Sequence, residues 1–156
     1  MFQFEDTVLE MLVIAGWSEK YRFDISRYLE WYKLHGCIPS EQVTHFLLHF
    51  GGLHIGTVTD RSARSALPFN LDPYPMLYRT KPCVEYALLA ELEGMDPCSI
   101  FHIGRACNDY MDFLMVSDGR VYLSFDGTIL FVAGNGTDAI ETLCLDKELV
   151  VINAPN

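Results

Sequence analysis

The stretch Thr44-His45-Phe46-Leu47-Leu48-His49-Phe50-Gly51-Gly52-Leu53-His54-Ile55 joins two kinds of hydrophobic pattern. Phe46 and Phe50 recur at helical spacing, whereas Leu53 and Ile55 alternate as residues of a strand do. The two adjacent glycines between these patterns allow a positive φ and a sharp turn. The stretch therefore predicts a helix, a glycine turn and a strand, and it separates a helical beginning from a sheet-rich remainder.

Outward from this stretch, hydrophobic periodicity and turn residues predict the other elements. Helices are expected at about 4–14, 25–35, 40–50, 82–93 and 137–146, and strands at 53–58, 69–71, 99–105, 113–116, 121–125 and 129–132. Residues 59–66 are small and polar, as in a surface loop. Ser40 is the expected N-cap of the third helix, and Thr137 or Asp138 that of the last. The order predicts one α+β domain over residues 1–156, with helices around a mostly antiparallel sheet.

Length and composition fit a folded protein. A chain of 156 residues with 50% hydrophobic residues can form one sizeable core. No apolar run approaches the roughly 20 residues that span a bilayer, and acids occupy the N-terminus where a secretory signal has basic residues. We expect a soluble, cytoplasmic protein without a membrane partner. The five cysteines are odd in number and lack CxxC spacing, so we expect buried thiols.

Negative charge is concentrated in the C-terminal half. The net charge is −10, and residues 83–156 carry 12 acidic side chains against only Arg105, Arg120 and Lys147. Such a surface repels nucleic acid and anionic membranes, and it attracts a basic partner. A surface that only keeps the protein in solution is the alternative interpretation.

Three histidines near the glycine turn are the candidate metal ligands. His45 and His49 share a helix face because they are four residues apart, and His54 follows the turn. The HExxH arrangement of a hydrolytic zinc helix is missing. We therefore favour histidines that flank the core, and we predict no metal and no cofactor.

No motif points to catalysis. Gly134-Asn135-Gly136-Thr137 precedes a helix, but it lacks the lysine of a phosphate-binding loop, so a plain strand-to-helix turn is favoured. Asp109 and Asp112 are close in sequence, yet spacing alone does not make them an acid–base pair. The sequence accordingly predicts no catalytic residue and no enzyme.

The order of several short motifs resembles the SUKH superfamily, in its third immunity-protein subfamily. The matching segments are Ala15-Gly16-Trp17, Phe23-Asp24-Ile25, Phe46-Leu47, Phe50-Gly51-Gly52-Leu53, Phe69-Asn70-Leu71-Asp72-Pro73, Ile103-Gly104 and Asp118-Gly119-Arg120-Val121-Tyr122. The structural signature comprises Gly16, Trp17, Phe46, Phe50, Gly51, Gly52 and Leu53. One departure is that the family's Gly-Arg after the Gly-Trp motif appears here as Lys20-Tyr21, with Arg22 one place later.

This resemblance implies an α+β bacterial immunity protein. Members of such families are not enzymes; they bind a cognate toxin domain, often a nuclease, and block it inside the producing cell. An acidic surface would suit a toxin with a basic active-site cleft. The candidate partner-binding carboxylates are Glu91, Glu93, Asp96, Asp109, Asp112, Asp138 and Glu141.

Two alternatives stay open at this point. The same fold would also serve a protein-interaction or regulatory module that has no toxin partner. A metal protein or enzyme centred on His45, His49 and His54 is the other alternative.

Overall fold

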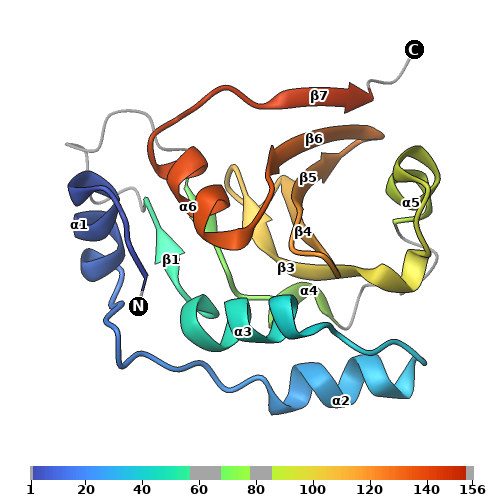
Figure 1. The fold of residues 1–156 in the computed structure, drawn as a ribbon, viewed down its shortest axis with the longest axis horizontal. Coiled ribbons are helices and arrows are strands. Elements are labelled where there is room, and N and C mark those ends of the chain that lie inside the picture. The colour runs from blue at the N-terminus through green and yellow to red at the C-terminus, as the bar shows by residue number, and fades with distance from the viewer. Residues whose placement is uncertain (1, 57–67, 78–85, 154–156) are drawn as a thin grey trace.

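The computed structural model describes residues 2–56, 68–77 and 86–153. Its described strands form one antiparallel sheet in which each strand pairs with the next along the chain (Figure 1). The strands are β1 (His54–Ile55), β2 (Phe69–Asn70), β3 (Ile100–Ala106), β4 (Met111–Val116), β5 (Val121–Phe125), β6 (Thr128–Ala133) and β7 (Val150–Asn153). Short hairpin connections between β3 and β6 produce this simple order.

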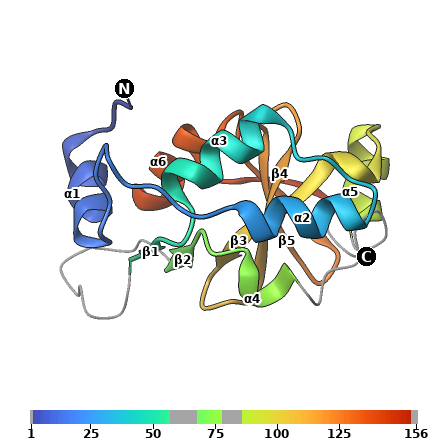
Figure 2. The same ribbon diagram turned by 90° about the horizontal axis from the view of Figure 1, so that it is seen from below.

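Helices cover both faces of the sheet. They are α1 (Asp6–Ile14), α2 (Ser26–Leu34), α3 (Glu41–Phe50), α4 (Tyr74–Leu77), α5 (Ala87–Glu93), the short 3₁₀ helix η1 (Pro97–Ser99) and α6 (Gly136–Cys144). Residues of α1, α2, α3 and α6 join the larger hydrophobic core, whereas α5 belongs to a second, smaller core. Figures 1 and 2 place α1 and α5 at opposite ends of the molecule.

Strand β4 contributes side chains to both hydrophobic cores. Phe113 and Met115 belong to the larger core, while Leu114 and Val116 belong to the smaller one. Successive side chains of a strand point to opposite faces, so a strand that is buried on both faces must be apolar throughout. This explains the continuous run of apolar residues in β4.

Helix α2 is fixed to a bulge in β3. The β3–β4 register shifts between His102 and Gly104, which disturbs the regular ladder there. The Tyr28 hydroxyl donates a 2.8 Å hydrogen bond to the His102 carbonyl, and the His102 N–H donates a 2.9 Å bond to Tyr32 Oη. Burial raises the pKa of Tyr28 well above its usual value and that of Tyr32 to about 12. Both phenols therefore stay protonated at physiological pH.

The predicted α+β class is confirmed, and so are the helix–glycine–strand order around Gly51 and the meander from β3 to β6. Ser40 caps α3 as expected, since its hydroxyl accepts a bond from the Val43 N–H. The N-cap of α6 differs from the prediction, because it lies earlier in the chain than Thr137 or Asp138. Asn135 occupies that position, and its side chain accepts the Asp138 N–H at 2.9 Å.

Two elements were not predicted. Helix α4 begins just after Asp72-Pro73, where we expected only the end of a strand; Pro75 fits because the first turn of a helix needs no N–H donor. Strand β7 is a short edge strand after the last helix. Strand β1 is shorter than the expected 53–58. Residues 57–58, the loop 59–66 and residues 82–85 of the expected helix 82–93 lie outside the described residues.

Within the described ranges, no helix is long and apolar enough to cross a membrane. The longest of the helices there, α3, has 10 residues. At a rise of about 1.5 Å per residue, it would cover roughly half of the bilayer's hydrocarbon core.

Candidate functional site

Trp17 of the signature and two residues of the connector that follows it hold the C-terminus of α3. The indole N–H of Trp17 donates to the His49 carbonyl at 3.0 Å, and the Phe23 N–H donates to the Leu48 carbonyl at 2.8 Å. The Tyr21 hydroxyl donates to the Gly51 carbonyl at 2.5 Å. The last carbonyls of a helix have no partner within the helix, so these bonds stabilise its end. The signature therefore has a structural purpose.

The glycine pair makes room for the ring of Phe23. A Cβ on Gly51 or Gly52 would overlap this ring, and Gly52 also has a φ of +81°, which disfavours other residues. Trp17 stacks on Phe50 with ring centroids 5.6 Å apart. The glycine turn therefore allows the connector before α2 to pack closely against the end of α3.

Arg22 takes a local role in this connector. Its guanidinium donates to the carbonyl oxygens of Glu19 and Tyr21 at 3.0 and 2.7 Å, and the residue is exposed. In this chain Tyr21 bonds the Gly51 carbonyl, and Arg22 lies at the surface.

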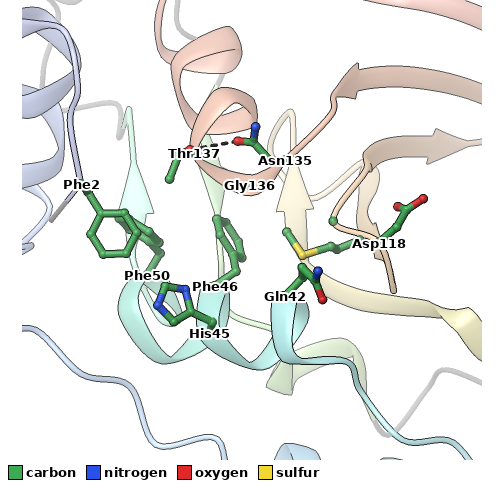
Figure 3. A pocket seen from close by; sticks show the side chains of 11 residues that line it. Phe2, Gln42, His45, Phe46, Phe50, Asp118, Asn135, Gly136 and Thr137 are labelled. Carbon is green, nitrogen blue, oxygen red and sulfur yellow. Dashed lines mark hydrogen bonds between the residues drawn. The ribbon is translucent and has the colours of Figure 1, made fainter.

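A cavity of about 190 Å³ lies between α3, the β4–β5 turn and the start of α6. Figure 3 shows Phe46, Phe50 and Gln42 facing Asn135 and Thr137, with Asp118 beside them. The Asn135 side chain already bonds the Asp138 N–H, and the Asp118 carboxylate in the lining pairs with Arg120 at 2.8 Å. The Asn135 cap agrees with a plain strand-to-helix turn at Gly134–Thr137.

The three histidines occupy two different places. The rings of His45 and His49 lie 4.4 Å apart, and His45 lines the cavity beside α3. His54 instead lines a second cavity of about 200 Å³, together with Asn70 and Asp109. Burial, followed by the charge of His45, lowers the pKa of His49 below its ordinary 6.5. Among the residues that the structure describes, no three His, Cys, Asp or Glu side chains are grouped to hold a metal.

The candidate carboxylates lie in three groups. The α5 group (Glu91, Glu93, Asp96) is at one end of the molecule, the hairpin group (Asp109, Asp112) lies at the β3–β4 connection, and the α6 group (Asp138, Glu141) lies on α6. The structure thus does not bring all seven together. A partner would therefore contact only some of these groups, or its interface would have to cover a large part of the surface.

Several of these carboxylates also have internal partners. Glu93 pairs with Arg120 at 3.1 Å, and Asp96 accepts the Cys98 N–H at 2.9 Å as the cap of η1. Asp109 lies 3.5 Å from the Nε of Arg105. Asp138 accepts the Asn135 amide at 3.0 Å. The partners of Asp96 and Asp138 are neutral, so these two contacts leave the negative charge of their sites unreduced, whereas Arg120 and Arg105 offset the charges of Glu93 and Asp109.

One buried polar side chain could not be recognised in the sequence. His102 is fully buried; its Nε2 lies 3.5 Å from the carboxylate of Asp112, and its ring stacks on Tyr86 with centroids 6.5 Å apart. The sequence around it, the apolar run Ile100–Ile103, did not indicate such a site. In a strand that is buried on both faces, the alternation of side chains does not show which residue has a polar neighbour. Asp112 thus sits beside this histidine instead of being fully available to a partner.

The cysteine prediction is only partly right. Cys37, Cys107 and Cys144 are present as thiols, and burial raises the pKa of Cys144 to about 12. Cys98 is disulfide-bonded, which contradicts the expected thiol. It is half-buried in the short helix η1 and packs against the edge of the larger core, whereas Cys144 is buried within that core.

These features describe an α+β module whose signature residues stabilise the fold and whose acidic residues lie at its surface. A family model, the SUKH-3 immunity protein, matches residues 4–146. The chain therefore belongs to the SUKH-3 immunity protein family, as the motif order indicated, and this membership assigns it an immunity function with a toxin as partner. No curated protein and no solved structure matches the chain.

Proposed function

We propose that the protein binds a cognate bacterial toxin domain inside the producing cell and neutralises it by covering its active site. Family membership over residues 4–146 is the observation that supports this function. The protein would act by binding, without turning over a substrate. A nuclease is the toxin that fits best, because its cleft is basic and this chain has a net charge of −10.

The acidic groups would accelerate association. Opposite charges on two partners raise the association rate at low salt, and this gain falls as ionic strength rises. Glu91 and Asp138 are exposed, and Glu141 is half-buried, so these carboxylates can act on an approaching partner. The on-rate with the toxin should therefore fall steeply with added salt.

Co-expression tests the function directly. A toxin gene found next to the gene of this protein is expressed in a sensitive host, with this protein or with an empty vector. Survival only with this protein supports the proposal, and equal killing in both strains overturns it. A toxin-free neighbourhood would favour the interaction module that lacks a toxin partner.

Group-wise variants would then locate the binding face. E91Q with D96N removes two charges from the α5 group, D109N alters the hairpin group, and D138N with E141Q alters the α6 group. The group whose neutralisation slows association faces the toxin. If no variant changes the association rate, electrostatic steering by these carboxylates is wrong.

A further inference from the structure

Helix α1 has two apolar sides. Val8, Met11 and Leu12 are buried in the larger core. On the opposite side, Leu9, Val13 and Ile14 are 39%, 57% and 71% exposed. With Asp6 and Glu10 they recur at intervals of three and four residues, so they share one helix face, which we call the outward stripe of α1.

An open groove of about 510 Å³ runs along this stripe, and the described residues that line it are Asp6, Leu9, Glu10, Val13 and Ile14. A surface helix normally presents polar residues to water on this side. Clustered exposed apolar residues with a polar rim mark protein-interaction sites more often than isolated ones do. The stripe is therefore a better candidate for an interface centre than single exposed residues such as Leu34.

Acidic residues surround one end of the stripe. Asp6 and Glu10 lie on it, and Glu5 precedes it at the N-cap. The Glu5 N–H donates to the Glu141 carboxylate at 3.2 Å, so the α6 group continues this negative region. Helix α1 contains no Lys or Arg. The surface therefore combines an apolar centre with a rim of a single charge.

We propose that the outward stripe of α1, with Glu141 beside it, is the centre of the toxin interface, and that it takes a toxin surface whose apolar side chains are flanked by Lys or Arg. This inference rests on the proposed function and names the face. Apolar anchors supply most of the affinity at an interface centre, while charges at its rim set the association rate and the choice of partner.

Charge argues against two other occupants. A second copy of the chain would bring Asp6 and Glu10 towards an equally acidic molecule of net charge −10, and like charges oppose that contact. A membrane is disfavoured because helices that lie on bilayers carry Lys and Arg on their polar side, whereas α1 carries only acids. A basic protein surface satisfies both the apolar and the acidic parts.

The test uses V13K/I14K, which places two cations on the stripe. Lysine has a higher helix propensity than valine or isoleucine, so α1 should still fold, and circular dichroism checks this. Affinity for the cognate toxin domain should fall about 30-fold or more. L34K is the matched control, because Leu34 is 79% exposed at the end of α2 and lies outside the stripe.

Charge is tested separately with D6N/E10Q, which should slow association and weaken its salt dependence while leaving dissociation nearly unchanged. If the wild type binds the toxin and V13K/I14K binds equally well, the stripe is not the interface and only this inference fails.

If the wild type itself neither binds nor protects, the proposed function fails. Light scattering that shows a dimer of the wild type and a monomer of V13K/I14K would overturn the toxin as occupant.

Discussion

The Tyr28 hydroxyl donates a hydrogen bond of 2.8 Å to the His102 carbonyl, which joins two residues 74 positions apart. Tyr32, one turn later on α2, accepts the His102 N–H. Both backbone groups of one residue in the β3 bulge are thereby satisfied by a helix instead of a strand. Buried polar groups without partners are costly, so these two phenols stabilise β3 beside its register shift.

Removing either hydroxyl should destabilise the protein. Y28F leaves the His102 carbonyl without its donor, and Y32F leaves the N–H without its acceptor, while both keep the aromatic ring. Each should lower the free energy of unfolding by about 1–3 kcal/mol in a urea titration. Y110F is the control, because Tyr110 is 82% exposed, and it should change stability by less than about 0.5 kcal/mol. Equal stability of Y28F and Y110F would contradict this account.

The contact between α3 and α6 predicts a second effect. A Cβ on Gly136 would overlap the ring of Phe46, whereas a Cβ on Gly134 would meet nothing within 4 Å. G136A should therefore lower stability by about 1–3 kcal/mol through overpacking, and G134A should be close to neutral. Thermal unfolding of the two variants compares them directly. If G136A were as stable as G134A, α3 and α6 would be able to move apart at Gly136 without a loss of stability.

The signature tryptophan gives a third prediction. W17F retains an aromatic ring against Phe50 but removes the N–H that bonds the His49 carbonyl. We expect a loss of about 1–3 kcal/mol in the free energy of unfolding, because a part-buried carbonyl at the end of α3 loses its donor. W31F, a change of the same chemistry on the half-buried Trp31, should cost less. If W31F lowered the free energy of unfolding more than W17F, the structural role assigned to the Gly16-Trp17 motif would be wrong.

Local patterns predicted the elements well because their signals are local. The Gly51-Gly52 turn, the Ser40 cap and the period-two strands depend on a few neighbouring residues. The bonds from Trp17 and Tyr28 were not foreseeable, because they join segments that are 32 and 74 positions apart. Strand β7 escaped prediction because it depends on pairing with β6, and four residues carry little periodicity.

The candidate site was harder to predict than the fold. Counting acids by position located charge in the C-terminal half, but the fold places acids of this half on separate elements: Glu91 lies on α5 and Glu141 on α6. The outward stripe of α1 was present in the sequence as Leu9, Val13 and Ile14. A hydrophobic pattern alone does not say which of two apolar sides of a helix the core will take.

The thiol of Cys144 should resist alkylation. Burial raises its pKa to about 12, so the reactive thiolate is only on the order of 0.01% of the folded population at pH 8. Iodoacetamide followed by mass spectrometry should leave Cys144 unmodified in native protein and label it in urea. The C144S variant identifies the modified peptide. Fast native labelling at this position would mean that the C-terminus of α6 opens readily.

The paired histidines predict a pH effect on stability. The folded state lowers the pKa of His49, mainly through burial and then through His45. The unfolded chain, with an ordinary pKa near 6.5, then binds the proton more readily, so stability falls as the pH drops below that value. H49Q should reduce this loss between pH 7 and pH 5. Urea titrations across that range measure the effect, and an identical slope for wild type and H49Q would assign the acid sensitivity to other groups.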